Sequence, residues 1–261
     1  LLLVDTNAIP SGVMTEIDRL GATKAVILGG TAAVGPVVEA ALKAELGSDA
    51  GIVTRVAGDN RYATADAVAK RVIEVLGTAY DGMGFVATGG NFPDALAAAP
   101  LAAAQQWPLF LAHPTSGLSA ATKAAMADVE EVLILGGTSA VSVATQNYLN
   151  TTYGDEDVTR LAGNDRYTTA VTIASYAVTD AGHAWDRVGI ATGENFPDAL
   201  AGGVLQGKVG SVMLLTTSTT LHPSTSAALA THATEIRTVT FFGGTGAVSQ
   251  AVRDAVAGVL E

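Results

Sequence analysis

The apolar residues of this chain fall into two alternating patterns: short uninterrupted runs, and longer stretches in which they recur at helical spacing. The helical spacing predicts a helix over 61–76 that Gly77 ends, and Pro93 is expected to open another helix, because proline costs no hydrogen bond at a first helical position. Further helices are predicted over 119–128 and 141–149. The short apolar runs, which predict strands, lie at 1–4, 52–56, 85–87, 108–112 and 132–135.

Strands that alternate with helices predict an α/β fold of tandem modules, each a mostly parallel sheet flanked by helices with right-handed crossovers. The tandem organisation follows from self-similarity, because Arg55–Thr64 returns as Arg160–Thr169 and Thr88–Leu96 returns as Thr192–Leu200. An apolar strand followed by a Gly-Gly-Thr turn occurs three times, with turns that begin at Gly29, Gly136 and Gly243. The spacing of about 104–107 residues is the size of a domain.

These repeats divide the chain into the second half of a truncated first repeat at 1–50 and two complete repeats at 51–154 and 155–261. The half repeat lacks both long segments and begins abruptly in an apolar run, without methionine or a signal peptide. We therefore expect a processing boundary at residue 1, with further sequence upstream. Half of an α/β unit exposes a sheet edge and apolar faces, so residues 1–50 are expected to pack on the neighbouring repeats or to self-associate with another chain.

The amino-acid composition and net charge of the chain limit the kinds of molecule that it is expected to bind. Hydrophobic residues make up 49% of the chain and charged residues 15%, which favours buried cores over disorder. The net charge of −11, with no run of Lys or Arg, disfavours nucleic acid and anionic membrane surfaces. No run of about 18 apolar residues occurs, so membrane insertion is not expected. The absence of cysteine excludes disulfides and thiolate metal sites.

Two recurring turns are candidates for ligand binding. A Gly-Gly-Thr turn can cradle a phosphate, but no dinucleotide or P-loop glycine pattern is present, and a tight turn that needs positive φ is favoured. In the Asn-Phe-Pro-Asp segments, Asn91 and Asn195 precede a helix start, and Asp94 and Asp198 lie in its first turn. Such residues cap a helix above a buried Phe staple, or form a ligand site at the carboxyl end of a parallel strand, and the two roles are compatible.

The Arg-x-x-Gly-x-x-Arg-Tyr segments contain four arginines, a sizeable share of the 14 basic residues of the chain: Arg55, Arg61, Arg160 and Arg166. The planar guanidinium group suits bidentate recognition of carboxylate or phosphate. We expect one arginine of each pair to form an internal ion pair, for instance Arg61 with Asp94. The other arginine is expected to contact a ligand or the neighbouring repeat.

No catalytic constellation stands out. The histidines do not recur at the spacing of a metal pair or a triad, and His113 and His222 are interpreted as surface loop residues. No Gly-x-Ser-x-Gly elbow is present. We therefore expect no metal and no cofactor. A site duplicated in tandem favours multivalent binding over catalysis, because weak repeated sites gain from avidity.

The repeats resemble the cell wall binding repeat 2 family in four sequence elements that follow one another in the same order. These elements are the Arg-x-x-Gly-x-x-Arg-Tyr-x-Thr opening, the Asn-Phe-Pro-Asp-Ala-Leu segment, the Pro-Leu-Phe-Leu strand and the Leu-Gly-Gly-Thr-x-Ala-Val ending. All four elements occur in 55–141. In residues 160–248 the third element departs from the family pattern, because the strand at 211–215 lacks the proline. The last two occur in 1–34. The resemblance covers nearly the whole chain, and it implies three modules around a pseudo-threefold axis.

The resemblance also implies non-covalent attachment to an anionic secondary wall polymer, as in surface proteins and wall hydrolases of Gram-positive bacteria. Because the chain itself is acidic, binding an anionic cell-wall polysaccharide requires local arginine clusters or bridging cations. The expected function is a non-catalytic, extracellular cell-wall-binding module. Two alternatives stay open: an enzyme acting on a phosphorylated or glycosidic substrate at the Asn-Phe-Pro-Asp turns, and a surface-layer or adhesin scaffold.

Overall fold

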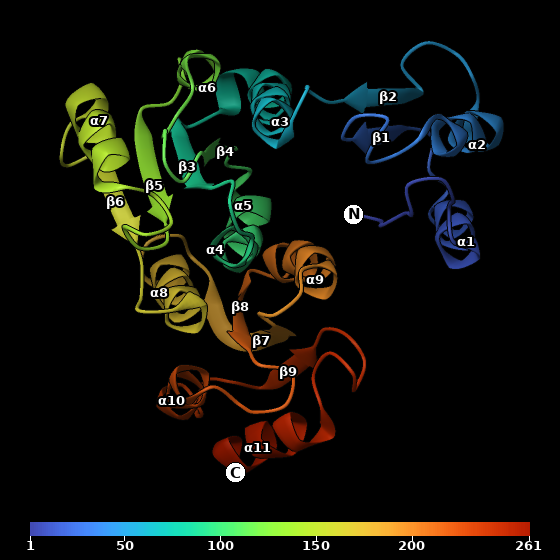
Figure 1. The fold of residues 1–261 in the computed structure, drawn as a ribbon. Coiled ribbons are helices and arrows are strands. Elements are labelled where there is room, and N and C mark those ends of the chain that lie inside the picture. The colour runs from blue at the N-terminus through green and yellow to red at the C-terminus, as the bar shows by residue number, and fades with distance from the viewer.

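The computed structural model describes residues 1–261 and contains three α/β modules that follow one another along the chain (Figure 1). We define the first module as residues 1–56, the second as 57–161 and the third as 162–261. Every strand pair in the three sheets is parallel, and helices flank the sheets. The predicted α/β fold of tandem modules is therefore confirmed.

The second module holds a four-stranded sheet in the order β4-β3-β5-β6. Its elements are α3 (Arg61–Leu76), the short 3-10 helix η1 (Gly77–Ala79), β3 (Met83–Thr88), α4 (Pro93–Ala97), α5 (Ala99–Gln105), β4 (Leu109–Ala112), α6 (Ala120–Ala125), β5 (Glu131–Leu135), α7 (Val143–Tyr153) and β6 (Val158–Leu161). Phe85 and Val86, successive residues of β3, are both fully buried. Successive side chains of a strand point to opposite faces, so both faces of the sheet are covered.

The third module holds a three-stranded sheet in the order β8-β7-β9. Its elements are α8 (Arg166–Thr179), β7 (Ala184–Thr192), α9 (Pro197–Lys208), β8 (Ser211–Thr216), α10 (Pro223–Thr231), β9 (Thr238–Phe241) and α11 (Gln250–Leu260). All six residues of β8 are buried, although β8 is an edge strand, because helices pack over it on both faces.

The first module is smaller and holds a two-stranded sheet. Its elements are α1 (Ser11–Leu20), β1 (Ala25–Leu28), α2 (Pro36–Leu46) and β2 (Val53–Val56). The strand predicted at 1–4 is wrong: these residues have irregular backbone, and Leu1, Leu2 and Leu3 are exposed. The equivalent run in the second module, β4, pairs with β3. The first module has no counterpart of β3, so residues 1–4 lack a partner for their backbone hydrogen bonds.

The sheets are offset from the sequence repeats. Strand β2, which opens the repeat at 51–154, pairs with β1 of the preceding half repeat. Strand β6, which opens the repeat at 155–261, pairs with β5 of the preceding repeat. Each repeat thus completes the sheet of the one before it, and the structural modules end a few residues after the sequence boundaries.

The second and third modules pack against each other and share a core. Helices α5 and α9 lie side by side, and glycines in α9 permit the close approach, because a Cβ atom on Gly203 would overlap Ala99. One cluster of 25 buried apolar residues runs from β3 and α5 of the second module to α8 and β8 of the third. The two modules therefore hold each other in a fixed orientation.

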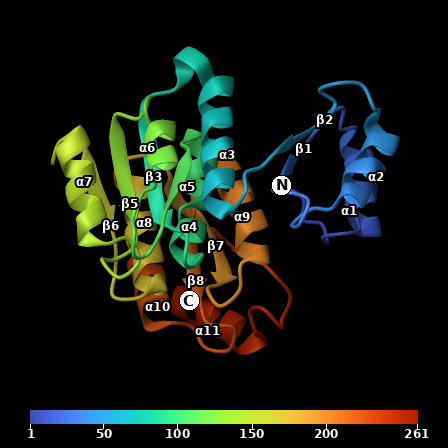
Figure 2. The same ribbon diagram turned by 45° about the horizontal axis from the view of Figure 1, so that its top comes forward.

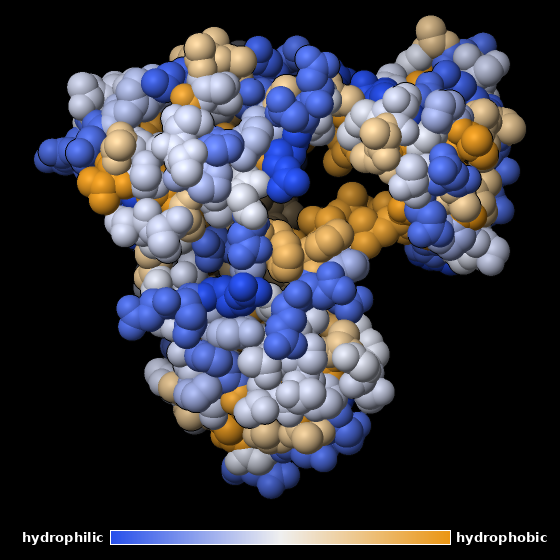
Figure 3. All heavy atoms as spheres, viewed as in Figure 1, coloured by the Kyte–Doolittle hydropathy of each residue, from blue (hydrophilic) through white to orange (hydrophobic).

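The first module stands apart from the other two in both ribbon views (Figures 1 and 2). On β1, Val26 is 56% exposed and Leu28 is 46% exposed, whereas their counterparts on β5, Leu133 and Leu135, are 2% and 0% exposed. These side chains line an apolar groove of about 440 Å³ opposite α3 and α5, and Figure 3 shows hydrophobic surface in this gap. The pseudo-threefold arrangement stays a prediction. None of the helices is both long enough and apolar enough to span a membrane.

Candidate functional site

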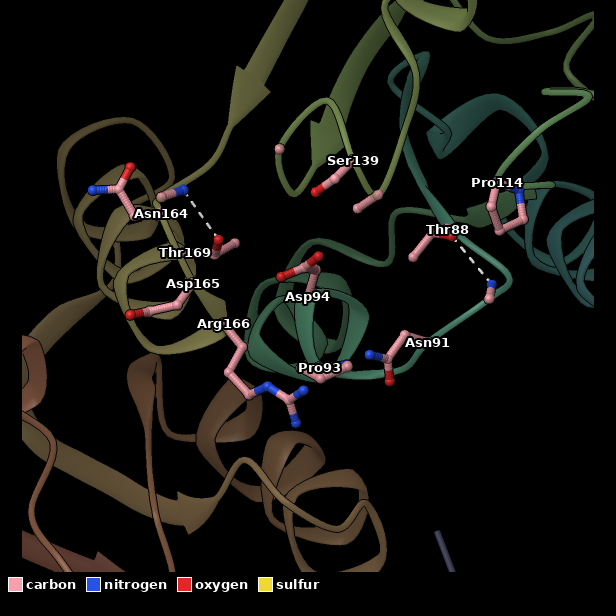
Figure 4. Close-up of a pocket in the computed structure, with 14 residues that line it drawn as sticks. Thr88, Asn91, Pro93, Asp94, Pro114, Ser139, Asn164, Asp165, Arg166 and Thr169 are labelled. Carbon is pink, nitrogen blue, oxygen red and sulfur yellow. Dashed lines mark hydrogen bonds between the residues drawn. The ribbon is translucent and has the colours of Figure 1, made fainter.

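A polar pocket of about 340 Å³ lies at the junction of the second and third modules (Figure 4). Three segments form most of its lining: the Asn-Phe-Pro-Asp turn after β3, the Gly-Gly-Thr turn after β5, and the loop at 163–169 that leads from β6 into α8. Pro114, in the loop after β4, completes it. Only 1 of its 14 lining residues is hydrophobic, so its walls offer hydrogen-bonding groups rather than an apolar surface.

Parallel pairing determines where this pocket forms. Strands β3 and β5 are neighbours, so the turns that follow them meet at the carboxyl edge of the sheet. In the first turn, Thr88 Oγ1 accepts a hydrogen bond from Gly90 N at 3.1 Å, and Asn91 Oδ1 accepts one from Phe92 N at 2.9 Å. Pro93 then begins α4. The exposed Asn91 keeps its side-chain N–H groups available for a ligand.

Asp94 supplies a half-buried carboxylate to the pocket, where it lies against Gly136 of the Gly-Gly-Thr turn. Burial raises the pKa of the Asp94 carboxyl group, and the positive charge of Arg166 partly offsets this increase. The predicted ion pair between Arg61 and Asp94 is absent, and that prediction is wrong. The cation that acts on Asp94 belongs instead to the following repeat, because consecutive repeats meet at this pocket.

Arg61 and Arg166 make equivalent contacts. Arg61 Nη1 donates to Gly89 O at 2.8 Å, and Arg166 Nη1 donates to Gly193 O at 2.6 Å. Each is the one hydrogen bond that the side chain makes to the protein, so Nε and Nη2 stay available. Arg166 lines the pocket, and Figure 4 shows its guanidinium group near Pro93.

Arg55 and Arg160 are used inside the protein. Arg55 Nη1 donates to Gly29 O at 2.6 Å, and Arg160 Nη1 donates to Gly136 O at 2.7 Å, so each arginine fixes the Gly-Gly-Thr turn of the preceding module. Arg55 also forms an ion pair with Glu39, with 2.9 Å between Nη2 and Oε2. In each motif, therefore, the first arginine is structural and the second keeps free donors.

The rest of the motif shapes the loop before each helix. Gly163 N donates to Thr169 Oγ1 at 3.0 Å, which closes the loop on itself, and the same bond joins Gly58 N to Thr64 Oγ1. Asp165 caps α8 by accepting hydrogen bonds from two backbone N–H groups of its first turn. The conserved spacing within the motif thus has a local structural cause that is separate from ligand binding.

His113 and His222, both interpreted from the sequence as surface loop residues, occupy equivalent positions in the second and third modules. His222 stacks on the motif tyrosine Tyr167, with ring centroids 4.2 Å apart, and its Nε2 lies 3.6 Å from Asp165 Oδ2. His113 lies beside the equivalent Tyr62, with centroids 5.7 Å apart. Each histidine follows a strand and directly precedes a proline, and this shared context was the available signal.

The phenylalanines of the two Asn-Phe-Pro-Asp turns contact each other across the boundary between the second and third modules. The rings of Phe92 and Phe196 meet edge to face with centroids 5.7 Å apart, and Phe196 remains 47% exposed. The interpretation of these residues as buried staples is therefore wrong for Phe196. The pair joins the second and third modules.

Two further places in the chain hold part of the same site. Between the first two modules, Gly30 lies beside the carbonyl of Gly58, but no Asn-Phe-Pro-Asp turn is present there. In the third module Asn195 Oδ1 accepts a hydrogen bond from Phe196 N at 2.9 Å, and Asp198 lies against Gly243. Arg166 reaches this third-module turn through its hydrogen bond to Gly193 O, but no arginine loop lies beside Asp198 as the loop at 163–169 lies beside Asp94.

The fold and this site define a class of repeat-built α/β proteins with a polar binding pocket between neighbouring repeats. The family described as cell wall binding domain 2 matches residues 55–146 and 160–253. The chain belongs to this family, whose domain binds the cell wall.

Two curated relatives are similar in sequence to this chain across its repeats. The chain is 32% identical over 202 residues to N-acetylmuramoyl-L-alanine amidase LytC of Bacillus subtilis (strain 168), covering 77% of this chain and 38% of the amidase. It is 26% identical over 260 residues to an amidase enhancer of the same organism, covering 98% of this chain and 33% of that protein. The chain thus spans less than two fifths of the length of either relative.

Solved structures share the fold. Cwp8 and Cwp6 from Clostridium difficile each superpose with a TM-score of 0.81 at 22% identity. The match covers 99% of this chain and 42% of Cwp8, and 100% of this chain and 39% of Cwp6. At this identity the likeness establishes the fold and not the ligand.

Proposed function

We propose that this chain is a non-catalytic, extracellular module that holds an anionic secondary wall polymer and so anchors a protein to the wall of a Gram-positive cell. The observation that carries the proposal is the pocket at the junction of the second and third modules, where Arg166 presents unpaired guanidinium donors. Guanidinium groups form strong, charge-assisted hydrogen bonds to phosphate and carboxylate. Arg166 would therefore bind the anionic group of the polymer.

The remaining lining fits the sugar part of such a polymer. Asp94 and Asp165 offer carboxylate oxygens that accept hydrogen bonds from sugar hydroxyls, and Asn91 and Asn164 offer both donors and acceptors. Two carboxylates beside one arginine would repel a bare polyanion. The pocket therefore favours a polysaccharide in which charged groups alternate with neutral hydroxyls.

The lining supports binding rather than catalysis. It includes no histidine that could activate Ser139 as a nucleophile. Repeated segments also favour anchoring, because the incomplete sites around Arg61 and Asp198 add weak contacts along one polymer, and linked weak sites gain avidity.

Sedimentation with purified Gram-positive cell walls tests the proposal. Arg166→Gln should weaken the affinity for walls by about tenfold or more, since a charge-assisted contact contributes about 1.5–3 kcal/mol. Arg71→Gln is the matched control, because Arg71 is exposed, pairs only with Glu74 and lies outside the pocket. Equal retention of both variants would exclude Arg166 from the binding site.

The nature of the polymer needs a separate comparison. Walls from which the anionic polymer has been extracted should no longer retain the wild-type chain, and added salt should weaken its binding to intact walls. Undiminished binding to extracted walls would remove the anionic polymer from the proposal and leave the wall itself as the partner.

A further inference from the structure

The second module shows how a following strand locks the Gly-Gly-Thr turn. Strand β6 pairs with β5 and brings Arg160 opposite Ile134. Arg160 Nη1 then donates to Gly136 O at 2.7 Å, Nη2 donates to Val141 O at 2.9 Å, and Nε donates to Gln146 Oε1 at 3.0 Å. One guanidinium group thus satisfies two carbonyls of the turn and is held by a side chain of α7.

In the third module the same turn follows β9, which is an edge strand in the order β8-β7-β9 and is not paired with a strand equivalent to β6. An arginine nevertheless reaches the equivalent carbonyls. Arg253 Nη2 donates to Gly243 O at 2.9 Å, and its Nε donates to Val248 O at 3.0 Å. Its guanidinium group also lies 5.0 Å from the ring centroid of Phe241 in β9. The arginine comes from helix α11 and not from a strand.

The sequence position of Arg253 strengthens the parallel. Glu39, Gln146 and Arg253 stand about 107 residues apart, each at the fourth position of the helix that follows a Gly-Gly-Thr turn. In the first two modules this residue holds the arginine of the following strand. A cation is unfavourable in the first turn of a helix, because the helix dipole is positive there. Arg253 therefore occupies a position where its charge needs a compensating contact, and the two carbonyls supply it.

We propose that Arg253 takes the place of a strand arginine at the Gly-Gly-Thr turn and so keeps the outer edge of β9 from pairing with a strand of the β6 type. The outer edge of β9 would otherwise accept a strand of the Val-Thr-Arg-Leu type, as β5 accepts β6. With Arg253 in place, the guanidinium position is filled and a second arginine would be repelled. The edge of the third module is thereby protected against adding a strand from another chain.

Replacing Arg253 tests this role directly. Arg253→Gln places at this position the residue type of the second module, where Gln146 Oε1 accepts a hydrogen bond from the strand arginine Arg160. A dye-labelled peptide with the sequence of residues 156–163 should bind this variant at least about tenfold more tightly than the wild-type chain, measured by fluorescence anisotropy. The same peptide with its arginine replaced by glutamine should not discriminate between the two chains. Equal binding of the arginine peptide to variant and wild type, including no binding to either, would overturn the proposal.

A second test within the second module does not depend on the folding of Arg253→Gln. Arg160→Gln should lower the midpoint of thermal unfolding, because Gly136 O and Val141 O lose their donors. Adding Gln146→Arg to that variant reproduces the third module and should restore at least half of the loss. Gln146→Arg alone should lower the midpoint, since two guanidinium groups would then compete for one position. Failure of the double variant to recover stability would show that a helix arginine cannot replace the strand arginine.

Discussion

The carboxylate of Asp94 lies so close to the backbone of Gly136 that a Cβ atom on the glycine would overlap Asp94 Oδ2. Asp198 and Gly243 repeat this relationship in the third module. Gly136 has φ of +93° and Gly243 has φ of +95°, a conformation that other residues rarely adopt. In the second and third modules the first glycine of the Gly-Gly-Thr turn is therefore required by its backbone and also by the aspartate beside it.

Gly136→Ala should lower the free energy of unfolding by about 1–3 kcal/mol, because the side chain forces a strained φ and displaces Asp94. Wall binding should fall as well, since Asp94 lines the pocket. Gly246→Ala is the control: Gly246 lies outside the pocket, and nothing lies within 4 Å of its Cβ position. Chemical denaturation and wall sedimentation measure both effects. Similar losses from the two variants would contradict this account of the turn.

The local pattern was sufficient to predict most elements. The helix predicted over 61–76 is α3, and the strand predicted over 132–135 is β5 with one residue added. Helix α7 begins at Val143 rather than at residue 141, because Ser142 Oγ accepts a hydrogen bond from Thr145 N and caps the helix there. The strand predicted at 1–4 failed, because an apolar run does not specify a pairing partner.

The site was harder to predict, because it is assembled from different repeats. The motif predicted that one arginine of each pair is internal, but proximity in sequence wrongly paired Arg61 with Asp94. Arg166 affects Asp94 only because the second and third modules pack together, which no local pattern encodes. Arg253 could have been found by aligning the three Gly-Gly-Thr turns, since it then falls at the position of Glu39 and Gln146.

Asp66 predicts a pH dependence of stability. This residue of α3 is 7% exposed, its Oδ2 accepts a hydrogen bond from Thr122 Oγ1 at 3.0 Å, and its Oδ1 has no partner. Burial raises the pKa of Asp66 above its ordinary value of 3.8, while Thr122 and Lys70 partly offset this. A raised pKa in the folded state stabilises the protein below pH 3.8, and this contribution is lost as the pH rises through the raised value.

Asp66→Asn should remove this loss of stability at higher pH, because asparagine does not ionise. The variant should therefore gain stability relative to the wild type as the pH increases from about 3 to 7. Thermal unfolding midpoints at several pH values provide the measurement. Thr122→Val should have the opposite effect, because removing the hydroxyl raises the pKa of Asp66 further. If the unfolding midpoints of wild type and Asp66→Asn change in parallel with pH, ionisation of this carboxylate does not destabilise the folded protein.

The contact between α5 and α9 predicts a remote effect on the pocket. Gly203→Ala should push the second and third modules apart, because the new Cβ atom would overlap Ala99, and overpacking costs about 1–3 kcal/mol. Wall binding should weaken although Gly203 lies outside the pocket. Gly258→Ala in α11 is the control, because nothing lies within 4 Å of its Cβ position. Unchanged wall binding by a folded Gly203→Ala variant would separate the pocket from this helix contact.

The exposed face of β1 predicts self-association of the chain. Val26 and Leu28 present apolar surface that the equivalent residues of β5 bury, so two copies that cover these faces would remove that surface from water. Sedimentation velocity should therefore show a dimer whose fraction increases with concentration. Val26→Glu should reduce it, because a charge buried in an apolar contact is strongly unfavourable. Val37→Glu is the matched control: Val37 is 60% exposed on α2 of the same module and lies outside the groove. A chain that stays monomeric at all concentrations, or an equal response to both substitutions, would show that this face of β1 is not the contact.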